Sequence, residues 1–208
     1  MPLHTVLNKA IIETAKVVRG VEPDQFGAPT PCRDWDVRAL TNHLLQVVHA
    51  LQLAGRRLPV PGDLWDRALI DDGWAAHFDD AGSTAIAAWV EGDAWEGGVT
   101  LGDMRMPAPA VAAMLVSDLA IHGWDLARAT GQTYRCDDDL AEVTYRFLAD
   151  MGDQGRRMGI YAAPLPPVGD ARTFEQALAL SGRDPGWAVP VTDGAHPRTA
   201  AGRTRSTT

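Results

Sequence analysis

The sequence predicts a mainly α-helical protein: an up-and-down four-helix bundle with a short extended excursion and extra C-terminal helices. Apolar residues recur at the helical spacing of three and four in several long segments, and Gly, Pro and Asp cluster between them. The 208 residues, 46% of them hydrophobic, are enough for one sizeable core. We expect a single domain over residues 1–190 and a flexible tail over residues 191–208, where no apolar pattern remains.

The first half of the chain predicts three helices. The first covers residues 5–19 and ends near Gly20, where the helical period of apolar positions stops. After a loop rich in Pro, Gly and Asp, Asp36 is well placed to cap a second helix that runs to about Ala54. A third helix is expected over residues 71–91.

At the start of the second half, the helical spacing of apolar residues gives way to an alternating pattern. The segment "AWEGGVTLGDMRMPAPA" combines glycines with alternating apolar residues, which predicts a short hairpin or extended excursion. Pro107 or Pro109 then opens a fourth helix that ends at Gly131. Acidic residues 137–139 favour the start of a fifth helix, and a proline-rich link leads to a short helix over residues 173–181.

Composition excludes several classes of partner. The chain has 19 basic and 27 acidic residues, a formal net charge of -8, whereas nucleic-acid and anionic-membrane surfaces require clustered cations. The two cysteines cannot form a disulfide framework or a cysteine-based zinc site. No signal-peptide pattern and no run of roughly 20 apolar residues is found. We therefore expect a cytoplasmic protein that binds a small molecule, with no nucleic acid or membrane as partner; a homodimer is compatible with the sequence.

The predicted fourth helix carries ionisable residues on its apolar face. At about 100° per residue, Asp118, His122 and Asp125 all fall within roughly 40° of Val111 on the helical wheel. Burying an unpaired carboxylate costs several kcal/mol, so these side chains need partners. Two interpretations stay open at this point: a sealed Asp–His pair in the bundle, or part of a metal site that takes a third ligand from elsewhere.

The predicted second helix offers that third ligand. His43 lies roughly 80° from the centre of its apolar stripe, at the edge of the buried face, whereas His49 lies about 160° away. The set His43, Asp118 and His122 suits a divalent metal, zinc first, with nickel or another divalent ion as alternatives. Three ligands leave a position for water or substrate, and Asp125 would orient an imidazole or act as a reserve ligand.

Other residues have mainly structural interpretations. Trp35 and Trp124 are interpreted as aromatic side chains of the core or of the site wall. Cys32, between Pro31 and the second helix, is more readily a small packed residue than a reactive thiol.

Two motifs resemble a known family. "TPCRDWDVRALTNHLL" (Thr30–Leu45) and "SDLAIHGWDLARATGQ" (Ser117–Gln132) are similar to signatures of the DinB-like, mycothiol-dependent maleylpyruvate isomerase group, and "SGRDPGW" (Ser181–Trp187) to its usual ending. The resemblance implies a four-helix bundle that binds a divalent metal through His43, Asp118 and His122, and it implies mycothiol as a co-substrate. Two departures are expected: the isomerase has Glu where this chain has Asp118, and it carries a C-terminal domain that this chain lacks after the bundle.

These observations leave three functions open. The first is a metalloenzyme in which the metal lowers the pKa of a low-molecular-weight thiol that reacts with a small electrophile by transfer or isomerisation. The second is a metal-dependent hydrolase that activates water with the same ligands. The third is a non-catalytic metal-binding bundle.

Overall fold

The computed structural model describes residues 1–166 and 171–190 and is built mainly from helices. The helices are α1 (Leu3–Arg19), α2 (Val37–Gly55), α3 (Trp74–Val90), α4 (Ala108–Ala129), α5 (Asp138–Arg157) and α6 (Thr173–Leu180). Between α3 and α4 the strands β1 (Gly98–Leu101) and β2 (Met104–Pro107) form an antiparallel hairpin. The predicted mainly helical class, the four-helix bundle with extra C-terminal helices and the predicted excursion are confirmed. The tail predicted over residues 191–208 lies outside the described residues.

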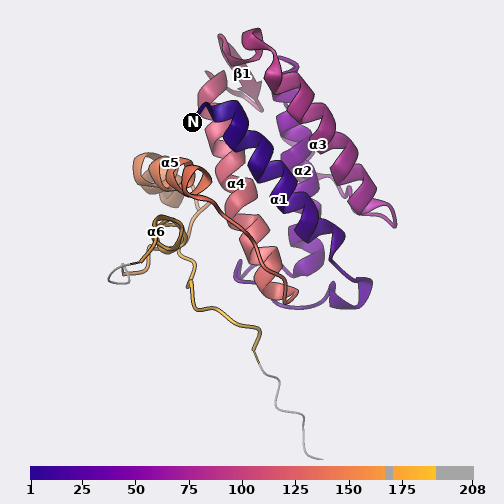
Figure 1. The fold of residues 1–208 in the computed structure, drawn as a ribbon, viewed down its shortest axis with the longest axis vertical. Helices are drawn as coiled ribbons and strands as arrows, with labels where there is room; N and C mark the ends of the chain where they lie inside the picture. Colours follow the sequence, from indigo (N-terminus) through magenta and orange to yellow (C-terminus); the bar gives the residue numbers. More distant parts are fainter. Residues whose placement is uncertain (167–170, 191–208) are drawn as a thin grey trace, which may run out of the picture.

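The first four helices form the bundle, and α5 and α6 lie against one side of it (Figure 1). Each of α1 and α2 packs against both α3 and α4, so α1 and α2, although consecutive in sequence, occupy one diagonal of the bundle. The hairpin lies at one end, above the start of α4. This arrangement places the middle of α2 directly against the middle of α4.

The helices do not alternate in direction, so the up-and-down order expected from the sequence is wrong for one pair, α2 and α3. The indole Nε1 of Trp89, at the end of α3, donates to the carbonyl of Leu51, near the end of α2, over 2.9 Å, so these two helices run parallel. In contrast, Trp35, just before α2, contacts His122 in the second half of α4, so α2 and α4 are antiparallel. The long connection from Arg56 to Gly73 allows the parallel pair, because the chain must return along the bundle before α3 begins.

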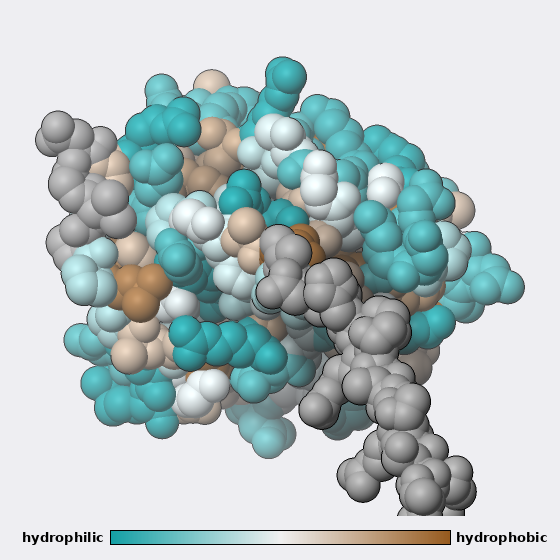
Figure 2. All heavy atoms as spheres, turned by 90° about the horizontal axis from the view of Figure 1, so that it is seen from below, coloured by the Kyte–Doolittle hydropathy of each residue, from teal (hydrophilic) through white to brown (hydrophobic). Residues whose placement is uncertain are grey.

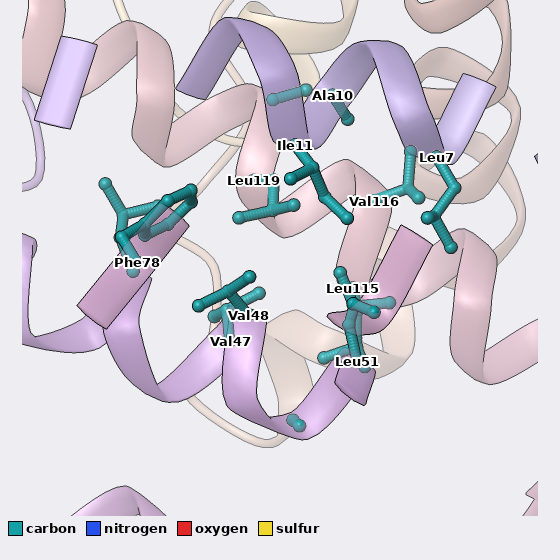
Figure 3. Close-up of a cluster of buried hydrophobic side chains, with 14 of the residues drawn as sticks. Leu7, Ala10, Ile11, Val47, Val48, Leu51, Phe78, Leu115, Val116 and Leu119 are labelled. Atoms are coloured by element: carbon teal, nitrogen blue, oxygen red, sulfur yellow. The ribbon is translucent and has the colours of Figure 1, made fainter. Parts of the chain in front are cut away.

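The core of the bundle is a single apolar cluster with contributions from all four helices (Figure 3). Side chains from α1, α2, α3 and α4 point toward one another there, among them Leu7, Ile11, Val48, Leu51, Phe78, Leu115 and Leu119. Burial of such side chains contributes about 25 cal/mol per Å² of apolar surface and dominates the folding free energy. The core therefore fixes the rotation of α2 and α4 about their axes.

The helix starts agree with the capping residues expected from the sequence. The carboxylate of Asp36 accepts a hydrogen bond from the backbone N–H of Ala39 over 2.8 Å at the start of α2. Asp137 accepts one from Leu140 over 3.0 Å at the start of α5. Each cap satisfies an N–H that has no partner within the helix.

By length and composition α4 is the one helix, among the described residues, that could cross a membrane. The expectation that no segment is apolar enough is therefore wrong for α4. However, 78% of its most apolar stretch is buried inside the protein, which is the environment of a core helix. Figure 2 shows a face that is mainly hydrophilic, with small separate apolar patches.

Candidate metal centre

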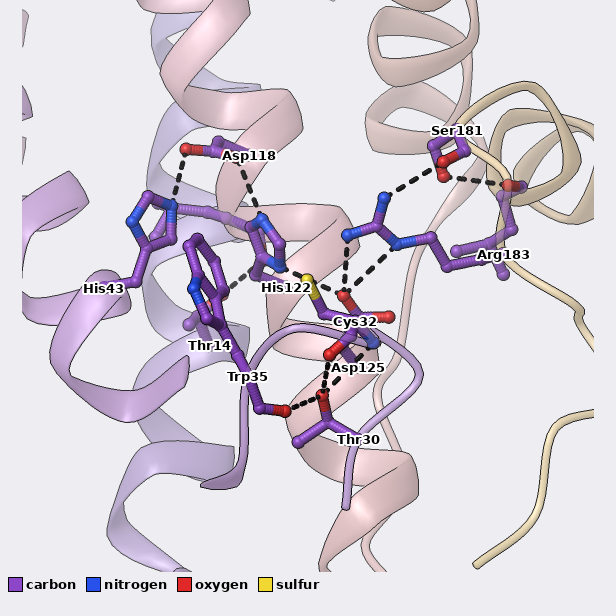
Figure 4. A network of polar contacts seen from close by, with 12 residues as sticks. Thr14, Thr30, Cys32, Trp35, His43, Asp118, His122, Asp125, Ser181 and Arg183 are labelled. Carbon is purple, nitrogen blue, oxygen red and sulfur yellow. Dashed lines mark hydrogen bonds and ion pairs between the residues drawn. The ribbon is translucent and has the colours of Figure 1, made fainter. Parts of the chain in front are cut away.

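Three side chains meet between α2 and α4: His43, Asp118 and His122 (Figure 4). Nε2 of His43 lies 3.1 Å from Oδ2 of Asp118, and Nε2 of His122 lies 3.4 Å from Oδ1 of the same carboxylate. One potential ligand atom from each residue falls within 4.8 Å of the others. The three residues predicted from the helical wheel are thus brought together.

The electrostatics of this cluster favour the ligand forms of both groups. Burial by itself would raise the pKa of Asp118, but the neighbouring His43 and His122 bring the pKa of this carboxyl below its usual range. Burial lowers the pKa of His122, and the nearby His43 acts in the same direction. An ionised carboxylate beside a neutral imidazole is the donor chemistry that divalent metals require.

The second ring nitrogen of His122 has its own carboxylate partner. Nδ1 of His122 lies 3.0 Å from Oδ2 of Asp125, whose side chain is completely buried. A neutral imidazole carries one N–H, so when Nδ1 donates to Asp125, the Nε2 lone pair faces Asp118. Two acceptors that face each other need a cation between them, and the donor set therefore fits a divalent ion.

Asp125 is held from its other side by Arg183, which follows α6. Nε and Nη2 of Arg183 lie 3.4 and 3.2 Å from Oδ2 of Asp125, and Nη1 donates to the carbonyl of Ser181 over 3.0 Å. The opposite oxygen, Oδ1 of Asp125, is buried and has no hydrogen-bond partner among the described residues. A chain of contacts thus runs from the segment after α6 through Asp125 to His122.

Cys32 lies closer to this cluster than the sequence indicated. Its Sγ, a nitrogen of His122 and a carboxylate oxygen of Asp125 fall within 4.8 Å of one another. Burial raises the pKa of the Cys32 thiol to about 11, although the Arg183 charge acts against this. At neutral pH Cys32 is therefore a protonated, weakly reactive neighbour of His122.

Aromatic side chains enclose His43. The ring of Trp35 lies 4.6 Å from the His43 ring and 5.2 Å from the His122 ring, centroid to centroid, and the Trp65 ring lies 5.9 Å from that of His43. Thr30 holds the loop by donating from Oγ1 to the carbonyl of Trp35 over 2.8 Å. Trp35 thus forms part of the site wall.

Trp124 belongs to the apolar core, one of the two roles expected for it, and does not line this cavity. It lines a separate hollow with Tyr134 and Phe174. Two residues correspond to about 200° on a helix, so Trp124 faces away from the side of α4 that carries His122. His49 is exposed on the far side of α2, as the wheel predicted.

A cavity of about 500 Å³ opens from the cluster toward α5 and the hairpin. His43 and Asp118 are part of its wall, together with Trp35 and Trp65. The carboxamide of Gln46, another wall residue, donates to the backbone carbonyl of Trp65 over 3.1 Å and holds it over the cavity. The ligand atoms are therefore accessible to a small molecule.

Arg183 is the residue of this site that sequence reasoning missed. It belongs to the "SGRDPGW" motif, whose position 58 residues after Asp125 gives no local sign of contact. The signal that could have found it is charge: a buried Asp125 requires a cation, and this motif offers Arg183. Arg128 further anchors the motif by donating from Nε to the carbonyl of Trp187 over 2.9 Å.

Comparison with known proteins agrees with this architecture. Residues 7–127 match the family described as "Mycothiol maleylpyruvate isomerase N-terminal domain". Two uncharacterized proteins of Mycobacterium tuberculosis, from two strains, are each 30% identical over 171 residues, which is 81% of this chain and 91% of theirs.

Solved structures show the same fold. The crystal structure of the mycothiol-dependent maleylpyruvate isomerase matches with a TM-score of 0.61 and 19% identity over 95% of both chains. A histidine-to-alanine variant of that isomerase matches with a TM-score of 0.51 over 74% of this chain and 73% of the other. The chain belongs to the mycothiol maleylpyruvate isomerase N-terminal domain family.

Proposed function

We propose that this protein is a divalent-metal-dependent enzyme that uses a mycothiol-like thiol for transfer or isomerisation on a small electrophilic substrate. The observation that supports this most is the convergence of His43, Asp118 and His122, because the first two of these residues also line a cavity of about 500 Å³. Zinc is the ion we expect, with nickel or another divalent ion as alternatives. Because small thiols are kept reduced inside cells, the proposal also places the protein in the cytoplasm.

Each residue of the cluster has a defined part in this proposal. Nε2 of His43, a carboxylate oxygen of Asp118 and Nε2 of His122 would hold the ion. Asp125 keeps the proton on Nδ1 of His122, which leaves Nε2 free as a ligand. Trp35 covers both imidazoles and limits the access of water to them.

A bound divalent ion would lower the pKa of a thiol so that the thiolate forms at neutral pH. The thiolate sulfur then attacks an electrophilic carbon: the carbon–sulfur bond forms and the carbon–carbon π bond opens. If rotation and loss of the thiolate follow, the substrate is isomerised and the thiol is regenerated. Alternatively, the neighbouring carbon takes up one proton, which balances the proton that the thiol lost. The product is then a thioether in which the thiol has been transferred to the substrate.

The test uses protein substituted with cobalt(II). Addition of mycothiol is expected to produce a sulfur-to-cobalt charge-transfer absorption, and an unrelated thiol a weaker one, because the open ligand position accepts sulfur. The Asp118→Glu variant is expected to keep the metal, since a carboxylate remains, and to change turnover because the oxygen moves by about one methylene.

The same experiment separates the alternatives. A hydrolase would show no spectrum that depends on the thiol, and its turnover would require only metal and water. A cobalt spectrum that stays unchanged at saturating mycothiol would therefore contradict the proposed use of a thiol.

A further inference from the structure

Methionines gather around the candidate site to an unusual degree. The chain has six methionines, and all except Met1 line the cavity beside His43 and Asp118. They come from three parts of the chain that are distant in sequence: Met104 and Met106 from the hairpin, Met114 from α4, and Met151 and Met158 from the α5 region. Methionine side chains are unbranched and polarizable, so they form an apolar wall that adapts to the shape of a ligand.

The cavity wall offers little positive charge to an anion. Among the described residues, neither Lys nor Arg lines it, and its one histidine, His43, already contacts its one carboxylate, Asp118. Tyr161, which also lines it, is neutral because burial and the charge of Asp118 raise the pKa of its phenol. The nearest cation in the site, Arg183, is already paired with Asp125 on the other side of His122.

A bound metal would not supply the missing charge during the reaction. With both imidazoles as neutral ligands, the two charges of a divalent ion are matched by the Asp118 carboxylate and by the thiolate. A carboxylate on the second substrate would therefore enter an apolar cavity without a partner, which is unfavourable.

The mouth of the cavity is also apolar. Met104, Met158 and Ile160 are 49%, 55% and 60% exposed, and each lines the cavity. Exposed apolar side chains that continue into an apolar cavity are typical of a ligand entrance.

We propose that this cavity binds an uncharged, mainly apolar substrate and discriminates against anionic ones. That the ligand is a substrate rests on the proposed function. The selectivity for uncharged ligands follows from the residues of the cavity wall alone.

Two fluorescent probes that differ by one sulfonate test the selectivity directly. N-phenyl-1-naphthylamine is uncharged, and 8-anilinonaphthalene-1-sulfonate carries the same rings with one negative charge. Each is titrated into the full-length protein after removal of metal with a chelator. We expect the uncharged probe to bind at least tenfold more tightly, because the wall carries no Lys or Arg and its His43 already contacts the Asp118 carboxylate.

Variants at the mouth assign the binding to this cavity. Met104→Lys is expected to weaken the uncharged probe and strengthen the sulfonate, so that the ratio of the two affinities falls at least fivefold. Met158→Lys provides a second position with the same expectation should the first variant not fold. Val90→Lys is the matched control, because Val90 is 62% exposed and does not line the cavity.

The inference would be overturned if the unmodified protein bound the sulfonate as tightly as the uncharged probe, or more tightly. It would also be overturned if a folded Met104→Lys variant had the same ratio of the two affinities as Val90→Lys. Neither measurement involves mycothiol. A failure of the cobalt experiment would therefore remove the proposed function and leave this result interpretable.

Discussion

Replacement of Arg183 by Met tests whether the buried ion pair behind His122 holds the site together. The side chains of Asp125 and Arg183 are 0% and 8% exposed, so neither can recover its charge–water interactions when the other is removed. In Arg183→Met, the carboxylate of Asp125 keeps only His122 Nδ1 as a side-chain partner among the described residues. The methionine has similar length, so the change removes mainly the charge and its hydrogen bonds.

The expected loss of stability is large. Removal of one partner of a buried pair costs about 3–5 kcal/mol, because the remaining charge is left uncompensated. For a domain of this size, each kcal/mol corresponds to roughly 2–4 °C in Tm, so Tm is expected to fall by about 6–20 °C. The measurement is thermal and urea unfolding of chelator-treated protein, followed by circular dichroism.

Two further variants make the result specific. Adding Asp125→Asn to Arg183→Met removes the buried charge as well, so the double variant is expected to be more stable than Arg183→Met alone. Arg19→Met is the matched control: Arg19 pairs with Asp79 over 2.6 Å at the surface, and loss of such a pair costs about 1 kcal/mol or less. If Arg183→Met proved no more destabilising than Arg19→Met, the buried pair would not have the stabilising role assigned to it.

Other predictions concern the ligands and the buried thiol. His43→Ala or His122→Ala is expected to abolish binding of about one divalent metal per chain. His49→Ala, on the exposed side of α2, should leave the metal content unchanged. Plasma emission spectrometry measures the metal content of all three variants, and full occupancy in the first two would refute the ligand set. In chelator-treated protein, alkylation of Cys32 by iodoacetamide, followed by mass spectrometry, should stay slow at pH 8 and accelerate as the pH approaches the raised thiol pKa of about 11. Stoichiometric alkylation of Cys32 within minutes at pH 8 would show that its environment has been misjudged. Asp118→Glu, tested with cobalt as described above, should retain the metal.

The local pattern of the sequence determined the helices and the phase of their functional side chains. Asp36 caps α2 as predicted because the interaction joins residues three apart, and such contacts do not depend on the rest of the chain. The same periodicity placed His43 toward α4 and His49 toward the outside. The helical wheel also separates Trp124 from His122, which agrees with the different direction of the Trp124 side chain in the structure.

Only the tertiary structure decided which residues these side chains contact. A helical wheel gives the direction of a side chain about its own axis, but the identity of its neighbour depends on how distant segments pack. The pairing of Asp125 with Arg183, the approach of Cys32 to His122 and the parallel course of α2 and α3 are therefore visible only in the folded chain. The methionine-lined cavity likewise joins three segments whose separate patterns show no common surface, because its walls form when α5 and the hairpin close over α4.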